Sequence, residues 1–182
     1  MGTRVLQATG ATADELQAGV ATIQQEQGLT PEFPAAVERA AEAAARAPRL
    51  PERDRTDLEL VTIDPVGAMD LDQAMHLEAD GDGYVVHYAI ADVMAFLAPG
   101  DPVDEEAHRR GESLYGADSK IPLHPKVLSE GAASLLPDQE RPAFVWTIRL
   151  DATGEALEGR GASIYLEAVR TGATPTSEPH GR

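Results

Sequence analysis

The chain has 182 residues, no cysteine and a formal net charge of −16. Its length suits one domain with a short appendage, and the lack of cysteine excludes disulfide bridges and thiolate zinc sites. It shows neither a signal-peptide pattern nor a run of about 18 apolar residues, so we expect a soluble, cytoplasmic protein that does not enter a membrane.

Two helices are predicted near the start of the chain. Over residues 12–28 apolar side chains recur at helical spacing, and Gly28 is placed to end the helix. Residues 34–47 are rich in alanine and have Pro34 near the first turn, which predicts a second helix. The charged, proline-containing stretch 48–55 reads as a linker and marks a domain boundary.

From residue 58 onward the hydrophobic pattern changes to that of strands. A tight turn is predicted at residues 80–83 (AspGlyAspGly), and a helix that begins after Asp101 and ends at Gly111. Strands are predicted at residues 58–63, 74–79, 84–91 and 144–150. This order predicts an α+β fold with a largely antiparallel sheet and flanking helices.

A cluster of aspartates in the stretch 62–78 (TIDPVGAMDLDQAMHLE) is the most informative local feature. Asp70 and Asp72 are two residues apart, so on an extended backbone their side chains project from the same face. The loop that contains Pro65 can bring Asp64 back to them. Three carboxylates close together repel one another unless a cation lies between them, and oxygen ligands suit Mg²⁺ or Mn²⁺. The alternative is that these aspartates only stabilise turns beside glycine and proline.

The charge distribution argues at first against a nucleic-acid-binding protein, because phosphate binding usually leaves a basic surface. Most of the acidic excess lies between residues 51 and 150. A solvated acidic surface explains most of these charges, and a metal site accounts for a few. The nearest approach to a basic patch consists of Arg109, Arg110, Lys120, Lys126 and Arg141.

Several ordered blocks together resemble the catalytic domain of the ribonuclease II/R family, often called RNB. The blocks are the aspartate stretch 62–78, then GYVVHYAIADV at 83–93, then the stretch 104–151 with SLYGADSKIPLHP inside it. The resemblance runs from about Arg55 to Gly154. It implies a processive 3′→5′ exoribonuclease that uses Mg²⁺ to hydrolyse single-stranded RNA to nucleoside 5′-monophosphates.

The resemblance also assigns expected roles to individual residues. Asp64 and Asp70 match acidic positions of the family's metal site, and Asp72 matches the aspartate whose loss is expected to abolish cleavage. Tyr115 matches the tyrosine that stacks on a base near the 3′ end of the RNA. Where the family usually has a further aspartate this chain has Gln73, whose neutral amide oxygen can still bind a cation. We therefore expect weaker Mg²⁺ binding or a preference for Mn²⁺.

Two further departures concern the segments before and after these blocks: OB-type modules are missing before them, and the resemblance stops about halfway through the family's catalytic domain. The first 50 residues are too few and too helical for the OB-type RNA-binding modules of the family. We expect a helical segment and linker at 1–50, a partial RNB-like domain at 51–158, and a disordered tail at 159–182. A partner chain would then supply the missing half of the domain.

Three interpretations of function follow. The first is the RNB exoribonuclease domain, active or inactive in this truncated form. The second is a catalytically dead module that binds metal or RNA, or a fragment that binds another protein. The third is an acidic domain whose aspartates only cap turns, which the ordered blocks disfavour.

Overall fold

A computed structural model describes residues 11–26, 28, 30–116, 120–157 and 162–172. Its helices and strands, in chain order, are α1 (Ala11–Glu26), α2 (Ala35–Ala45), β1 (Gln73–Asp80), β2 (Gly83–Ala91), the 3₁₀ turn η1 (Val93–Ala95), α3 (Pro102–Arg110), β3 (Leu114–Tyr115), β4 (Lys120–Ile121), the π-helical turn η2 (Leu128–Ala132), β5 (Glu140–Leu150) and β6 (Ala162–Arg170). The predicted α+β class is confirmed. Among the described residues no helix combines the length and apolar character that crossing a membrane requires.

The centre of the fold is a four-stranded antiparallel sheet with the order β1-β2-β5-β6. β1 and β2 form a hairpin whose turn is the predicted AspGlyAspGly segment. Gly83 in this turn lies so close to β5 that a Cβ atom would stand 2.2 Å from the carbonyl oxygen of Leu150, so only glycine fits there. The turn sequence thus allows the hairpin and β5 to pack edge to edge.

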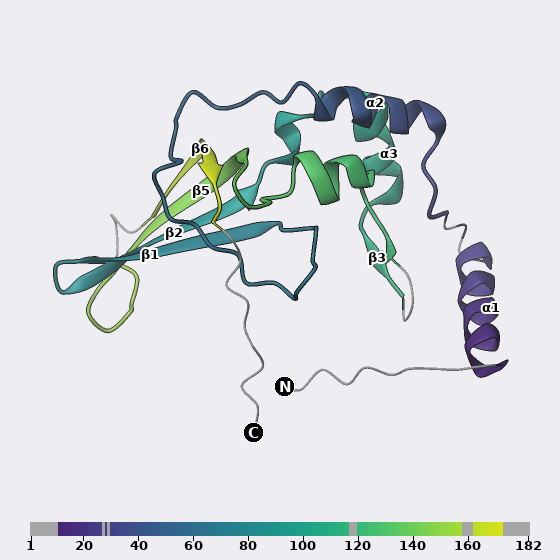
Figure 1. Ribbon diagram of the computed structural model, residues 1–182, viewed down its shortest axis with the longest axis horizontal. Coiled ribbons are helices and arrows are strands. Elements are labelled where there is room, and N and C mark those ends of the chain that lie inside the picture. Colours follow the sequence, from purple (N-terminus) through teal and green to yellow (C-terminus); the bar gives the residue numbers. More distant parts are fainter. Residues whose placement is uncertain (1–10, 27, 29, 117–119, 158–161, 173–182) are drawn as a thin grey trace.

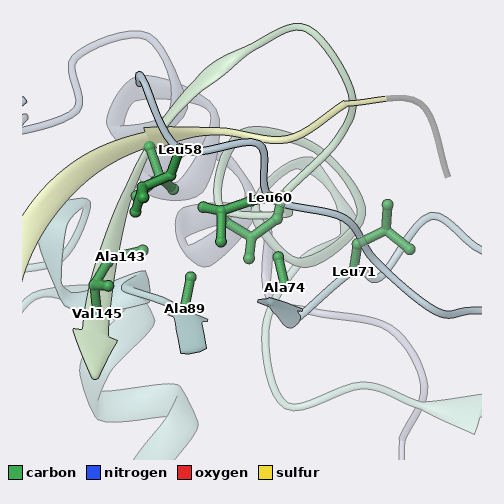
Figure 2. Packing of buried hydrophobic residues seen from close by; sticks show 9 residues of the cluster. Leu58, Leu60, Leu71, Ala74, Ala89, Ala143 and Val145 are labelled. Carbon is green, nitrogen blue, oxygen red and sulfur yellow. The ribbon is translucent and has the colours of Figure 1, made fainter. Parts of the chain in front are cut away.

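One face of the sheet is covered and forms the main core. Alternate residues of the strands point into it and meet Leu58 and Leu60, which precede the sheet in the chain (Figure 2). The predicted strand at 58–63 is wrong in detail. This segment is extended, but it crosses the end of the sheet and makes only isolated bridges, from Val61 to Met75 of β1 and from Leu60 to Thr171. Its side chains cover the core, while its backbone does not extend the ladder.

The opposite face of the sheet carries apolar side chains in register across the strands. Ile90 of β2 is opposite Phe144 of β5, which is opposite Leu166 of β6. Together with Leu77 and Tyr84 on the same face, these residues are between 37% and 55% exposed. We call this surface the open face; the linker and η1 border it at Phe144 and Leu166, where they line a pocket with these two side chains.

Two helices, α2 and α3, lie side by side at one end of the sheet, whereas α1 stands apart from them (Figure 1). A second core forms there from residues of α2, η1, α3 and η2. Asp101 caps α3 by accepting hydrogen bonds from the backbone N–H groups of Val103 and Asp104, at 2.9 and 2.8 Å. The predicted bounds of this helix are confirmed.

Within α3, Glu106 is buried and is paired with two arginines. Arg109 donates to its carboxylate at 2.5 and 2.8 Å, and Arg110 donates at 2.8 Å. The hydrogen bond from Arg109, opposed by burial and supported by Arg110, lowers the pKa of Glu106 to about 2. This cluster fixes the last turn of α3, from which the β3–β4 hairpin leaves.

The expectation of a disordered tail from residue 159 is corrected for part of that segment. Residues 162–170 form β6, which pairs with β5, and Ala168 and Val169 are buried. The outer edge of β6 is bonded to the linker, since Ala168 exchanges backbone hydrogen bonds with Arg53 and Arg55 at 2.8 and 2.9 Å. Residues 158–161 and 173–182 lie outside the described part, so the expectation for them stays a prediction.

Candidate functional site

The aspartates singled out in the sequence line one pocket of about 410 Å³ at the start of β1. Asp64, Asp70, Asp72 and Gln73 all contribute to its wall. The other lining residues are Val61, Ile63, Ala74, Met75 and Tyr88. The structure thus brings together the four residues that the sequence predicts as metal ligands.

Asp70 is held in place through its two neighbours in the chain. The buried hydroxyl of Ser134 donates a hydrogen bond to the carbonyl of Met69 at 2.7 Å and accepts one from the N–H of Leu71 at 2.9 Å. The carbonyl of Leu71 in turn accepts from the N–H of Leu135 at 2.9 Å. This Ser134 clamp fixes the backbone on both sides of Asp70 and sets where its carboxylate enters the pocket.

Asp72 lies where the loop joins β1, and β2 fixes its backbone, because the N–H of Ala91 donates to its carbonyl at 2.9 Å. Partial desolvation raises the pKa of the Asp72 carboxyl, and the negative charges of Asp70 and Asp64 raise it further, against the opposing effect of Lys120. The carboxyl group is therefore in a site where added positive charge is stabilising.

Lys120 of β4 reaches into this acidic site. Its Nζ donates to Oδ2 of Asp70 at 2.6 Å, and this hydrogen bond is the main reason that the pKa of Asp70 is lowered. From the sequence, Lys120 was expected only in a loose basic patch. The contact joins residues 50 positions apart, and no local pattern in the sequence signals it.

Gln73 stands where the family usually has an aspartate, and its amide oxygen accepts a hydrogen bond from the hydroxyl of Tyr88. The two residues lie on neighbouring strands, with Tyr88 opposite Met75 in the register. Tyr88 therefore orients the Gln73 side chain along the pocket wall. This contact occupies one lone pair of the amide oxygen and leaves the other.

The loop between Asp64 and Asp70 turns back at Pro65–Ala68, where the N–H of Ala68 donates to the carbonyl of Pro65 at 3.0 Å and Gly67 has a φ of 85°. This turn brings Asp64 to the pocket that Asp70 and Asp72 line, as the sequence predicts.

The chemistry of the donor set fits a divalent cation, since carboxylate and amide oxygens are the ligands that Mg²⁺ and Mn²⁺ prefer. In the described residues, however, no three His, Asp or Glu side chains stand in an arrangement that could hold a metal ion. Lys120 takes one oxygen of Asp70 instead. The ligand roles of the four residues therefore stay predictions, and the pocket needs a local rearrangement to close on a metal.

Tyr115, the predicted base-stacking residue, is 74% exposed on β3. It does not line the pocket, but it pairs with Lys120 across the β3–β4 hairpin. The Nζ of Lys120 lies 5.4 Å from the centroid of the Tyr115 ring. An open aromatic ring beside the acidic pocket is suited to stack on a base, and this role also stays a prediction.

The other basic residues of the expected patch contact their own partners. Arg109 and Arg110 pair with Glu106, Lys126 pairs with Glu130 at 3.6 Å, and Arg141 donates to the carbonyl of Ser134 at 3.1 Å. Asp92 is buried after the end of β2, and its carboxylate accepts a hydrogen bond from the N–H of Met94 at 3.0 Å and so caps η1.

Comparison with known proteins extends the resemblance found in the sequence. A family model described as the RNB domain matches residues 52–175, which includes β6. The chain is 36% identical over 125 residues to a probable exosome complex exonuclease RRP44 of Caenorhabditis elegans, covering 67% of this chain and 13% of that protein. It is 41% identical over 102 residues to ribonuclease R of Escherichia coli, covering 56% of this chain and 12% of that protein.

Among solved structures the fold is similar to ribonuclease R of Mycoplasma genitalium in complex with ribose-methylated single-stranded RNA. The TM-score is 0.76 at 26% identity, covering 87% of this chain and 25% of that one. The chain therefore spans a quarter or less of the length of these three proteins.

Proposed function

This chain belongs to the RNB domain family, and on that premise we propose that its aspartate-lined pocket is the metal-binding part of a 3′→5′ exoribonuclease site. The substrate is single-stranded RNA and the products are nucleoside 5′-monophosphates. The observation that carries the proposal is that Asp64, Asp70, Asp72 and Gln73 line a single pocket in a chain of this family.

In this proposal Asp64, Asp70 and Asp72 hold Mg²⁺ or Mn²⁺ through carboxylate oxygens, with Gln73 as a neutral oxygen donor. When bound, the metal supplies activation of water and stabilisation of the leaving oxygen in phosphodiester hydrolysis. The Ser134 clamp positions Asp70, and Tyr88 orients Gln73. Asp72 is the residue whose loss abolishes cleavage.

Tyr115 stacks on a base near the 3′ end of the RNA. Stacking on an aromatic ring contributes about 1–3 kcal/mol per base and tolerates any sequence, which suits a degradative enzyme. The similarity to a ribonuclease R that was solved with single-stranded RNA supports this choice of ligand. Since the net charge of the chain is −16, further basic surface is needed to bind the RNA backbone.

We infer that a partner chain with the remainder of an RNB domain docks on the open face and supplies that surface. Met75 and Tyr88 lie on this face of the sheet and also line the pocket, so a chain that covers the face reaches the pocket rim.

Size-exclusion chromatography with a separately expressed remainder of the domain tests the docking. Leu77→Glu on the open face should prevent co-elution, whereas Leu157→Glu, in a loop outside the sheet, should not.

The activity is tested with a 5′-labelled single-stranded RNA incubated with the protein and Mg²⁺ or Mn²⁺, with and without the partner. We expect a metal-dependent ladder that shortens from the 3′ end and is absent with Asp72→Asn. If well-folded protein leaves the RNA intact under both conditions, the catalytically dead module becomes the better interpretation.

A further inference from the structure

Lys120 lies between the two parts of the candidate site, the aspartate-lined pocket and the exposed ring of Tyr115. Its ammonium group contacts the Asp70 carboxylate at 2.6 Å and lies 5.4 Å from the centre of the Tyr115 ring. It is thus placed between a predicted metal ligand and the predicted base-stacking residue.

Both ends of this contact are anchored. The Ser134 clamp fixes the backbone on both sides of Asp70. The base of the β3–β4 hairpin is fixed because Ile121 is buried and the N–H of Leu123 donates to the hydroxyl of Ser113 at 3.0 Å. The ion pair is therefore a specific link between two positioned elements.

The negative charges of the pocket explain why the ammonium group of Lys120 lies there. Three aspartates line a single pocket, and Lys120 is the basic residue that contacts them among the described residues. Its positive charge opposes the repulsion that Asp70 and Asp64 exert on Asp72. A divalent ion carries twice that charge and accepts several oxygen ligands at once, so it competes directly for the Asp70 oxygen.

We propose that Lys120 is the internal counter-cation of the metal-free site and that a divalent metal ion displaces it from Asp70. Metal binding then requires the ammonium group to leave the carboxylate. Because Lys120 and Tyr115 pair across the hairpin, this exchange couples occupancy of the metal site to the surroundings of the base-stacking residue. The inference rests on the proposed metal site, but not on catalysis.

The ion pair is easily exchanged. The side chains of Lys120 and Asp70 are 25% and 37% exposed, and ion pairs as open as this one shift an equilibrium by about fivefold at most. A divalent ion with three carboxylate ligands can exceed that factor. Removal of the lysine charge should therefore strengthen metal binding, which is the opposite of what loss of a merely structural residue would do.

The sequence offers a convenient experiment, because Lys120 and Lys126 are its only lysines. Lys126 pairs with Glu130 and does not line the pocket, so it serves as a matched control. In protein labelled with ¹³C at the lysine ε-carbon, a Mg²⁺ titration without RNA should shift the Lys120 signal to saturation and leave that of Lys126 unchanged. Calorimetry with Mn²⁺ should show about three- to fivefold tighter binding for Lys120→Met than for wild type, the factor expected from loss of such a pair. Lys126→Met should stay within about twofold, as should Lys120→Arg, which keeps the pair.

The outcomes separate this inference from the proposed function. If metal binds but the Lys120 signal does not move and Lys120→Met binds like Lys126→Met, the exchange is refuted and the metal site stands. If no variant binds metal, both the exchange and the proposed metal site are refuted. If metal binds and displaces Lys120 but the RNA stays intact, the exchange is confirmed and only the proposed activity fails.

Discussion

Substitution of Ser134 by alanine tests whether the clamp around Asp70 holds the site together. Ser134 is buried, and its hydroxyl makes two hydrogen bonds, to the carbonyl of Met69 at 2.7 Å and from the N–H of Leu71 at 2.9 Å. Each neutral hydrogen bond contributes about 1 kcal/mol net, and a buried N–H left without a partner costs about 1–3 kcal/mol. We expect Ser134→Ala to lower the free energy of unfolding by about 2–3 kcal/mol.

Urea unfolding followed by circular dichroism measures this loss. With a slope of about 2 kcal/mol per molar urea, the midpoint should fall by about 1–1.5 M. Ser129→Ala is the matched control, because within the described part of the chain the Ser129 hydroxyl makes one long hydrogen bond, to the carbonyl of His124 at 3.4 Å. Its loss should move the midpoint by less than about 0.3 M. Mn²⁺ affinity should also fall in Ser134→Ala under conditions where the protein stays folded. Equal midpoints for the two variants would refute the clamp.

Three further variants test other parts of the site and fold. Glu106 has a folded pKa of about 2 against an ordinary value of 4.5, so its paired carboxylate stabilises the fold above pH 4.5, and this contribution is lost as the pH falls toward 2. Glu106→Gln should therefore destabilise the protein at pH 7 but hardly at pH 2.5 in thermal unfolding, whereas the exposed neighbour Glu105→Gln should have little effect at either pH. Gln73→Asp should tighten Mg²⁺ binding by about tenfold in calorimetry because it adds one negative charge near the ion, and affinity equal to that of Gln73→Asn would contradict this. Tyr115→Ala should weaken binding of single-stranded RNA by about 1–3 kcal/mol in fluorescence anisotropy, while Tyr84→Ala, on the open face, should not; equal losses would argue against stacking.

Local features of the fold were predictable from the sequence where neighbouring residues decide them. The turn at 80–83 and the helix bounded by Asp101 and Gly111 follow from glycine, proline and capping side chains. The strand β6 was missed because a turn and a glycine-rich stretch precede it, and its charged Glu167 interrupts the apolar pattern. That glutamate is buried in the fold and pairs with Arg53 at 3.0 Å, a contact between distant parts of the chain.

In the candidate site, too, the local features were predictable from the sequence and the contacts between distant residues were not. The spacing of Asp70 and Asp72, with a turn after Asp64, was enough to predict that the three carboxylates approach one pocket. The residues that control Asp70 were not predictable, because Ser134 and Lys120 reach it from positions more than 45 residues away. Such contacts depend on how the sheet and the hairpin pack, and no local periodicity encodes them.

The most direct test of the central claim is the binding of Mn²⁺ to the aspartate pocket, measured by calorimetry without RNA. Asp72→Asn removes one proposed ligand, and Asp82→Asn removes the same charge from an exposed turn outside the pocket. The proposal predicts that wild type and Asp82→Asn bind the ion alike, whereas Asp72→Asn loses most of the affinity. Equal binding by all three proteins would contradict a metal site formed by Asp64, Asp70 and Asp72.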